Sequence, residues 1–368
     1  MKTKKAGPGI LYAVFLLVIC GSWILWFFLA QFTDSEAYEN RKMHAMPQLT
    51  SVREYLAFPG EFEEFLNDRI PFRNNLVTMN RAIDYYAFGS VRHDRVTDGK
   101  DGWLFYSDRN DGDPIACYQG TNLLMDVHLE QIAKNCIKQR DYLAEQGIEF
   151  VIFVAPNKER VYWDKMSDKY GLPAETYRAL QIVSYLKENT DLRVVYPYEE
   201  LMAAKEALGE EIYYKTDTHW NYIGGYVGSC ALLRELGIEM PEVTSGQIRI
   251  SYEGERTGDL ASNLGLGALL KSAEYAVEGY DTHQAESQGE FKDVYYYRAK
   301  DADPRKLYVV RDSFFVSMLP YISSQFNESY ARFHTSYKYK DFAAQHPDIF
   351  VYETVERYIE NLSRFSVR

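Results

Sequence analysis

Asp217 and His219 stand two residues apart in the segment 213–226, which is rich in aromatic residues, small residues and glycines. In an extended backbone, residues i and i+2 project from the same face, roughly 6–7 Å apart. The Asp217 carboxylate can then accept a hydrogen bond from one ring nitrogen of His219 and leave the other nitrogen free to act as a base. The spacing therefore predicts the acid and the base of a nucleophile–base–acid arrangement. The alternative is a histidine satisfied by a nearby carboxylate in an ordinary loop.

Ser313 is the candidate nucleophile. It follows the apolar run 307–310, at an expected turn from a strand into a helix. In open α/β sheets, ligands bind outside the carboxyl ends of the strands. A backbone N–H near a helix N-terminus can also stabilise a developing oxyanion. The alternative is that Asp312 and Ser313 serve only to cap the helix, but the Asp217 and His219 pair favours the catalytic interpretation.

A metal site is a weaker interpretation of the same residues. Asp217 and His219 offer two ligands with no third histidine nearby, and no C-x-x-C spacing indicates zinc. Outside residues 10–30 the cysteines are Cys117, Cys136 and Cys230. They allow at most one disulfide, between Cys117 and Cys136, and buried free thiols are the favoured prediction. We expect no metal and no cofactor.

Helical and strand patterns alternate along most of the chain. Short apolar runs predict strands at 103–106, 150–155, 192–196, 307–310, 329–333 and 349–352. A first helix is predicted to start at Ser51, ahead of a turn at Pro71, and further helices are predicted at 74–88, 129–146, 174–189, 198–208, 224–236, 315–325, 337–345 and 355–362. This alternation predicts an α/β fold with a mainly parallel sheet flanked by helices. Residues 241–300 break the rhythm and predict a small β-rich insertion or lid.

The N-terminus predicts a membrane anchor. Three lysines within the first five residues precede an uncharged, mostly apolar run over 10–30. This length fits a membrane-spanning helix, and lysines on one side only favour a cytoplasmic N-terminus. We therefore expect a single-pass cell-membrane protein with an extracytoplasmic catalytic domain. The predicted parts are a cytoplasmic tail (1–9), a transmembrane anchor (10–30), a juxtamembrane segment (31–50) and the catalytic domain (51–368).

The composition limits the classes of partner. The 368-residue chain carries a formal net charge of -12, which argues against electrostatic binding of nucleic acid. It also contains 31 tyrosines. Tyrosines can stack on sugar rings, although they more often fill half-buried positions.

Two short blocks resemble those of a known enzyme family. Residues 311–314 (Arg-Asp-Ser-Phe) resemble the Gly-Asp-Ser block of SGNH hydrolases, and residues 217–220 (Asp-Thr-His-Trp) resemble their acid–histidine block. The acid–histidine block comes first here, in the order of the alginate O-acetyltransferase AlgX/AlgJ-type family, called DHHW proteins in Gram-positive bacteria. The resemblance implies an SGNH-hydrolase-like fold with a circularly permuted block order. Further matching segments are 39–41 with Pro47, 62–73, 102–105, 156–158 with 161–162, 258–260 and 355–357.

Two positions depart from the pattern of that family. Thr218 stands where the DHHW name has a histidine, and Arg311 replaces the glycine of Gly-Asp-Ser. The chemistry does not require a histidine at position 218. Arg311 changes the backbone before the nucleophile or points a cation at an anionic substrate.

The resemblance implies acyl-ester chemistry, in which an acetyl group passes onto Ser313 and then onto a sugar hydroxyl. His219 would be the base, and Asp217 would fix its tautomer. The Ser313 N–H and a second donor would stabilise the oxyanion. The candidates for that donor or for substrate contacts are Asn157, Lys158, Arg311, Asn263 and Trp220.

The expected partners are a polysaccharide acceptor and a multi-pass membrane acyltransferase that supplies the acetyl group. A carbohydrate O-acetyl esterase with the same triad is one alternative, because transfer requires that a sugar outcompete water in the site. A non-catalytic scaffold that binds polysaccharide or a partner enzyme is another. That scaffold is favoured if Ser313 and His219 lie too far apart to interact.

Overall fold

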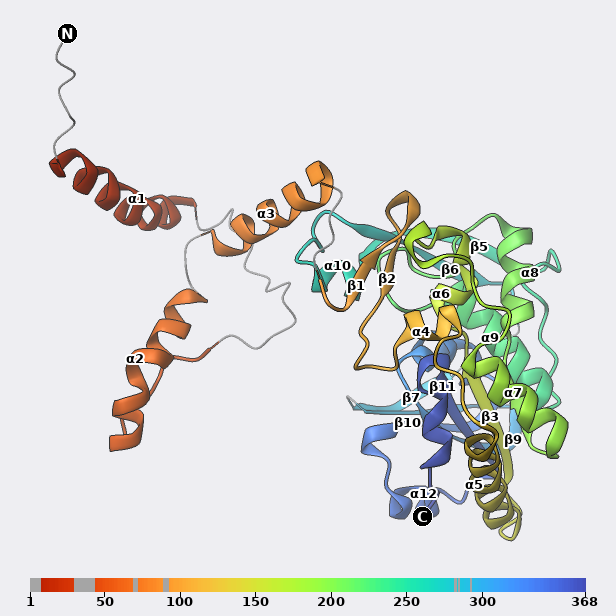
Figure 1. Ribbon diagram of the computed structural model, residues 1–368. Helices are drawn as coiled ribbons and strands as arrows, with labels where there is room; N and C mark the ends of the chain where they lie inside the picture. Colours follow the sequence, from red (N-terminus) through yellow and green to blue (C-terminus); the bar gives the residue numbers. More distant parts are fainter. Residues whose placement is uncertain are drawn as a thin grey trace. The chain divides into compact units, whose positions relative to one another are not determined.

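A computed structural model describes residues 8–29, 44–68, 72–88, 93–280, 283, 285–291 and 293–368. The chain divides into two compact units, one of Met1–Val91 with Ser262–Leu269 and one of Arg92–Ala261 with Leu270–Arg368 (Figure 1). Most of the predicted cytoplasmic tail and most of the predicted juxtamembrane segment lie outside the described residues.

The first unit contains the helices α1 (Pro8–Leu29), α2 (Val52–Asn67) and α3 (Arg73–Phe88). Helix α2 begins where the sequence predicts, because Ser51 and Glu54 form a capping box. The Ser51 hydroxyl accepts from the Glu54 N–H, and the Glu54 carboxylate accepts from the Ser51 N–H. The two helices predicted between residues 51 and 88 are therefore confirmed.

Helix α1 coincides with the predicted membrane anchor over 10–30. Among the described residues, no helix combines the length and the apolar character needed to cross a membrane. This finding contradicts the predicted anchor and, with it, the predicted single-pass location in the cell membrane.

The second unit is built on a seven-stranded sheet with the order β4-β3-β11-β9-β10-β8-β7 (Figure 1). Strands β4, β3, β11, β9 and β10 are parallel to one another, whereas β8 and β7 are antiparallel and form one edge. The predicted mainly parallel α/β sheet is therefore confirmed. Its strands are β3 (Glu149–Ala155), β4 (Arg193–Val195), β7 (Ala285–Phe291), β8 (Val294–Ala299), β9 (Asp303–Arg311), β10 (Phe326–Phe333) and β11 (Ile349–Val355).

Both faces of the sheet are covered. On β3, Val151 and Phe153 enter one apolar core, and Phe150 and Ile152 enter the other. This is the period of two that a strand imposes. Because both faces are buried, β3 reads in sequence as one unbroken apolar run. Helices α8 (Tyr198–Leu208) and α9 (Tyr222–Glu235) contribute to the first core, and α5 (Asp126–Ala144), α7 (Arg178–Asn189) and α12 (Tyr339–Gln345) contribute to the second.

The predicted β-rich insertion over 241–300 is divided between two sheets. Strands β5 (Arg249–Thr257) and β6 (Lys271–Glu278) form a separate antiparallel pair. Strands β7 and β8 instead extend the main sheet, because β8 pairs with β10. Two of the four described strands in this segment, β7 and β8, are therefore part of the central sheet. A further two-stranded sheet joins β1 (Val96–Asp98) to β2 (Leu104–Tyr106), which confirms the strand predicted there.

Two predicted helices near the C-terminus are shorter or tighter than expected. The segment 315–325 forms the 3-10 helix η5 (Phe314–Met318) followed by the single turn α11 (Leu319–Ile322). Pro320 stands in the first turn of α11, where its missing N–H limits the preceding helix. The segment 355–362 forms the 3-10 helix η7 (Glu356–Ser363). All four cysteines are free thiols, so the Cys117–Cys136 disulfide does not form.

Candidate active site

The loop that carries Asp217 and His219 is a tight turn in front of α9. Tyr213 and Trp220 face each other across an isolated antiparallel bridge, and the Asn221 side chain caps α9 by accepting two N–H groups. Asn221 therefore fixes where the helix begins. Trp220 is fully buried, and its indole N–H donates to the Phe314 carbonyl at 2.8 Å. This bond ties the loop to the segment that follows Ser313.

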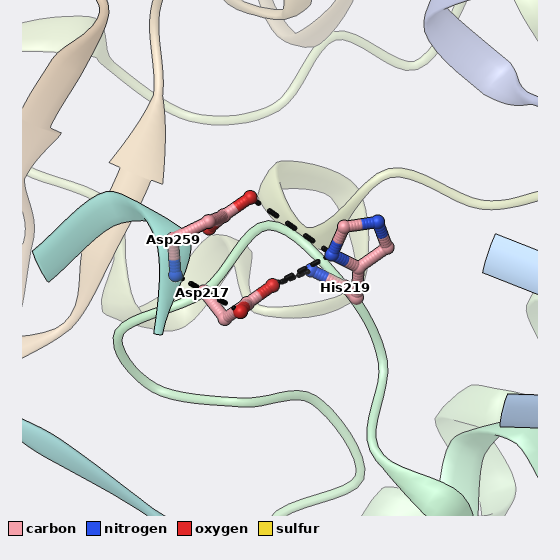
Figure 2. Close-up of side chains that lie close together, drawn as sticks. All are labelled: Asp217, His219 and Asp259. Carbon is pink, nitrogen blue, oxygen red and sulfur yellow. Dashed lines mark hydrogen bonds and ion pairs between the residues drawn. The ribbon is translucent and has the colours of Figure 1, made fainter. Parts of the chain in front are cut away.

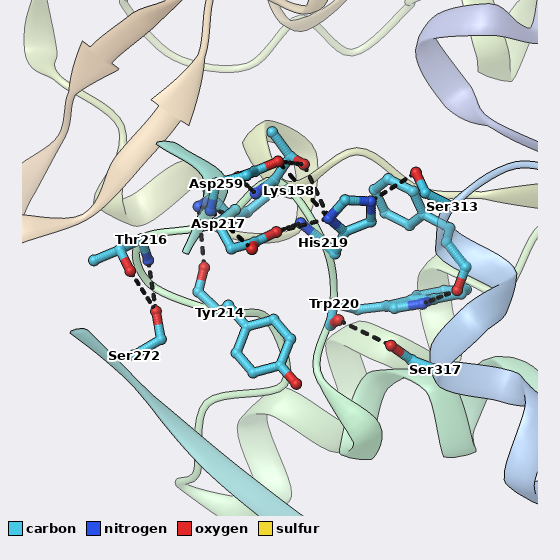
Figure 3. A network of polar contacts seen from close by, with 12 residues as sticks. Lys158, Tyr214, Thr216, Asp217, His219, Trp220, Asp259, Ser272, Ser313 and Ser317 are labelled. Atoms are coloured by element: carbon cyan, nitrogen blue, oxygen red, sulfur yellow. Dashed lines mark hydrogen bonds and ion pairs between the residues drawn. The ribbon is translucent and has the colours of Figure 1, made fainter. Parts of the chain in front are cut away.

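Three side chains form a continuous hydrogen-bonded chain (Figure 3). Asp217 Oδ1 lies 2.6 Å from His219 Nδ1, and His219 Nε2 lies 2.7 Å from Ser313 Oγ. An ionised carboxylate can only accept, so Nδ1 carries the proton that is donated to Asp217. In the neutral ring Nε2 is then the acceptor, and the Ser313 hydroxyl donates to it. Ser313 is exposed, whereas Asp217 is buried. The two predicted blocks therefore meet, with a base in contact with an accessible hydroxyl.

The electrostatics of the pair support an ionised acid and a basic ring. Burial raises the pKa of Asp217, but the charge and hydrogen bonds of His219, together with the Asp259 N–H, lower it by more. The net pKa of Asp217 lies well below its ordinary range. Burial lowers the pKa of His219, whereas the Asp217 carboxylate raises it by more, so its net pKa is raised. An imidazolium formed at His219 is therefore stabilised by the neighbouring carboxylate.

Ser313 is held by the residues before it and by the neighbouring strand. Strand β9 ends at Arg311, and Asp312 accepts from the N–H groups of Phe314 at 2.8 Å and Val355 at 2.6 Å. Asp312 thus fixes the turn from β9 into η5 and joins it to β11. The Ser313 side chain makes no capping bond. The alternative of a purely structural cap applies to Asp312, while the Ser313 hydroxyl faces His219.

Lys158 contributes to the loop and not to the nucleophile's surroundings. It is 1% exposed, and its ammonium donates to the carbonyl oxygens of Tyr214 at 3.1 Å, Lys215 at 3.3 Å and Asp217 at 2.6 Å (Figure 3). Burial lowers the pKa of Lys158 to about 8. Its donors are used by the backbone of the acid–histidine loop, so it holds that loop in place.

Arg311 is also engaged within the protein. Its guanidinium lies over the rings of Tyr295, at 4.8 Å, and Phe333, at 5.2 Å, and it donates to the Asp312 carbonyl at 3.0 Å. The side chain is 3% exposed in relative terms and does not present a cation at the surface. It packs at the turn that leads from β9 to Ser313, in the position where the family pattern has a glycine.

The remaining two candidates are placed differently. Asn157 follows β3 at the same sheet edge and is 2% exposed, and its N–H donates to Glu356 at 2.9 Å. Neither polar atom of its side-chain amide has a partner within the described chain. Asn263 ends α10 (Asp259–Asn263) and falls in the first unit, so its position relative to Ser313 is not defined.

The structure adds two residues that the spacing analysis did not identify. Asp259 lies beside the acid and the base, and its Oδ2 is 3.9 Å from His219 Nδ1 (Figure 2). Arg357 lies beside the residue that follows Ser313, with its guanidinium 5.4 Å from the centres of the Phe314 and Tyr106 rings. Both fall within segments of the family resemblance, at 258–260 and 355–357. That resemblance was the available signal, but it assigns them no role.

Asp217, His219 and Asp259 also form a cluster of the kind that can bind a metal, because one donor atom from each lies within 4.8 Å of the others (Figure 2). The hydrogen bonds occupy these atoms, however. Nδ1 donates to Asp217, and both Asp259 oxygens accept from Thr218, at 2.8 and 2.7 Å. A cation would have to displace these bonds, so the arrangement fits a proton relay better than a metal centre.

Comparisons with known proteins identify the family of this chain. A family model described as the SGNH hydrolase-like domain of acetyltransferase AlgX matches residues 96–297, which include Asp217 and His219 and end before Ser313. The chain is 26% identical over 237 residues to a probable alginate O-acetylase AlgJ of Pseudomonas fluorescens, covering 62% of this chain and 56% of that protein. The corresponding protein of Azotobacter vinelandii is 26% identical over 217 residues, covering 57% and 52%. The chain thus spans about half the length of these curated relatives.

A solved structure shares the fold. Bacillus cereus PatB1, determined with a sulfonyl adduct, matches with a TM-score of 0.54 at 14% identity, covering 74% of this chain and 99% of that one. At this identity the likeness concerns the fold, which is an SGNH-like α/β arrangement.

Proposed function

The chain belongs to the AlgX-type family of SGNH hydrolase-like acetyltransferase domains, and from this premise we propose that it is a serine-dependent O-acetyltransferase that acts on a polysaccharide hydroxyl. The observation that carries the proposal is the continuous chain from Asp217 through His219 to Ser313, with links of 2.6 and 2.7 Å. We further infer that the order of the blocks, acid and histidine before serine, is a circular permutation of the ordinary SGNH order.

In the first half of the proposed reaction, Ser313 Oγ attacks the carbonyl carbon of a donor acetyl ester. His219 Nε2 takes the hydroxyl proton, and Asp217 stabilises the imidazolium that forms. The tetrahedral intermediate collapses by breaking the bond to the leaving oxygen, which takes the proton from His219. The products are acetyl-Ser313 and the free donor alcohol.

The second half runs the same steps with an acceptor. A sugar hydroxyl loses its proton to His219 Nε2 and attacks the acetyl carbonyl carbon of acetyl-Ser313. Collapse of the second intermediate breaks the bond to Ser313 Oγ, which regains the proton from His219. The acetyl group is now an ester of the sugar, and the enzyme is restored.

The oxyanion formed in each half needs donors near the carbonyl oxygen. The Ser313 N–H at the start of η5 is the first candidate. The second is the Asn157 side chain, because its amide is buried without a partner and follows β3 at the strand edge where Ser313 follows β9. Lys158 does not fit this role, because its ammonium donates to backbone carbonyls. Arg311 does not fit it either, because its guanidinium is buried over the rings of Tyr295 and Phe333.

One observation favours carbohydrate ester hydrolysis as a second candidate function. Ser313 is exposed and the His219 side chain is 24% exposed, so water can reach the acyl group unless an acceptor covers it. The scaffold alternative loses its support, because it required Ser313 and His219 to be too far apart to interact. For transfer, we infer a polysaccharide acceptor and a multi-pass membrane acyltransferase as the source of acetyl groups.

The test compares Ser313→Ala with Ser317→Ala, one turn further along η5. Ser317 makes only a 3.5 Å contact with the Trp220 carbonyl and is the matched control. With a small activated acetyl ester and an acceptor oligosaccharide, Ser313→Ala should reduce acetyl transfer by about 10³-fold or more, with an unchanged unfolding transition. Mass spectrometry of the protein caught during turnover should find the acetyl adduct on Ser313. Undiminished transfer by Ser313→Ala would contradict the proposal, and acetate release without sugar acetylation would favour the esterase.

A further inference from the structure

The backbone N–H and both carboxylate oxygens of Asp259 are bound to the acid–histidine turn. Its backbone N–H donates to Asp217 Oδ2 at 3.0 Å (Figure 2). Its carboxylate accepts from the Thr218 N–H at 2.8 Å and from the Thr218 hydroxyl at 2.7 Å. The residue between the acid and the base is thus fixed at two points. Asp217 is held from the side opposite to His219.

The Asp259 carboxylate also brings a second negative charge close to the base. Its Oδ2 lies 3.9 Å from His219 Nδ1, the ring nitrogen that donates to Asp217. Ser313 lies at the other ring nitrogen, Nε2 (Figure 3). The charge of Asp259 is therefore on the far side of the ring from the reacting hydroxyl, where it can act on the ring without touching a substrate.

We propose that Asp259 is a positioning residue for the acyl transfer: it locks the Asp217–His219 turn through Thr218 and, as a second carboxylate beside Nδ1, makes His219 a stronger base. This inference rests on the proposed function for its catalytic meaning, but not for the titration that tests it. A ring that takes a proton from Ser313 becomes positive, and two nearby carboxylates stabilise that state more than one does.

Three cationic side chains also lie near the acid–histidine turn. Arg357 lowers the pKa of His219, because its cation disfavours a second positive charge. Arg256 lies 4.0 Å from Asp217 Oδ2 and is itself paired with Glu274 at 3.6 Å. The Lys158 ammonium is bound to the Asp217 carbonyl. Among the described residues, the two carboxylates within ion-pair distance of the His219 ring are Asp217 and Asp259.

Two variants separate the charge of Asp259 from its hydrogen bonds. Asp259→Asn removes the charge and retains a carbonyl oxygen that can accept from Thr218. Thr218→Val removes the hydroxyl that donates to Asp259 and that lies 3.1 Å from His219 Nδ1, and it retains the charge of Asp259. An opposite charge within 4–6 Å raises the pKa of a histidine by about 1–3 units, and the 41% exposure of the Asp259 side chain places the effect near the lower end, at about one unit.

The experiment is an NMR titration of the His219 ring in the full chain, in an Ser313→Ala background so that no acyl group is transferred. Asp259→Asn should lower the His219 pKa by about one unit, and Thr218→Val should lower it by less, because it removes only a neutral contact to Nδ1 and keeps the carboxylate. In the Ser313 protein, the acid limb of the pH–rate profile should move to lower pH by the same amount as the His219 pKa in each variant. Because the NMR titration needs no turnover, it remains decisive even if the protein transfers no acetyl group.

An Asp259→Asn protein that folds and titrates like its parent would overturn the proposal, even with reduced activity, because a purely structural role lowers activity equally at all pH values. If the Asn variant does not fold, Asp259→Ser takes its place in the same comparison. That side chain is smaller, neutral and still able to accept from Thr218. An unchanged His219 pKa in the Ser variant would overturn the proposal in the same way.

Discussion

Lys158→Met tests whether a buried ammonium holds the acid–histidine loop. Lys158 Nζ lies 5.5 Å from the centre of the Trp103 ring and 5.1 Å from that of Phe105. A methionine side chain can fill much of the same space. The substitution leaves the carbonyl groups of Tyr214, Lys215 and Asp217 without their donor. Each buried acceptor that loses its partner costs about 1–3 kcal/mol, and relaxation with entry of water recovers part of the sum. We therefore expect the free energy of unfolding to fall by about 2–4 kcal/mol at pH 7.

The pH dependence of stability provides a second signature. The pKa of Lys158 falls from 10.5 to about 8 on folding because of burial. Below pH 8, Lys158 is protonated in both the folded and the unfolded state, so it adds no pH dependence to the free energy of unfolding. Between pH 8 and 10.5 the unfolded state binds more protons, so the free energy of unfolding should rise with pH. At about 1.4 kcal/mol for each pKa unit, the rise amounts to about 3 kcal/mol in the natural protein and is absent in Lys158→Met.

The assay is urea unfolding followed by tryptophan fluorescence at pH 7, 8, 9 and 10 for both proteins, with acetyl transfer measured alongside. Lys165→Met is the control, because Lys165 pairs with Asp101 at the surface and such pairs contribute little to stability. Because the loop carries Asp217, acetyl transfer and the free energy of unfolding should both fall in Lys158→Met. Neither should change in Lys165→Met. A Lys158→Met protein with the natural unfolding midpoint, or with the same slope between pH 8 and 10, would refute the reasoning.

Two further predictions concern the chemistry and the packing behind it. Asp217→Asn keeps the shape of the side chain but lets its amide donate to His219, which favours the wrong tautomer of the ring. Acetyl transfer should therefore fall by about 10³–10⁴-fold in steady-state assays, without loss of the fold. A fall of less than tenfold would argue against Asp217 as the orienting acid. Gly225→Ala places a Cβ 2.4 Å from the Ser317 carbonyl oxygen, so α9 and η5 must separate and thermal unfolding should occur several degrees lower. Gly60→Ala, in an open position on α2, is its control and should leave the transition unchanged or slightly raised. Equal melting temperatures for the two alanine variants would contradict the close approach.

The sequence by itself determined the features that depend on neighbours along the chain. The two-residue spacing brings Asp217 to His219, and a strand followed by a helix places Ser313 at the carboxyl end of β9. The apolar runs identify the parallel strands, and the helix predicted over 224–236 corresponds to α9. These features follow from backbone periodicity and capping, which act over a few residues. A continuous run such as 10–30 is a less certain guide, and the predicted membrane anchor there is contradicted.

Only the tertiary structure decided which distant groups meet. Ser313 and His219 are 94 residues apart in the chain, and their 2.7 Å contact depends on strand order and register. The same holds for Asp259, which reaches the turn from 42 residues away, and for Lys158, which was a candidate donor and is instead bound to the loop backbone. The division of 241–300 between two sheets is of the same kind. Periodicity defines which face of an element is buried, but the partner of that face is set by packing among segments that are remote in sequence.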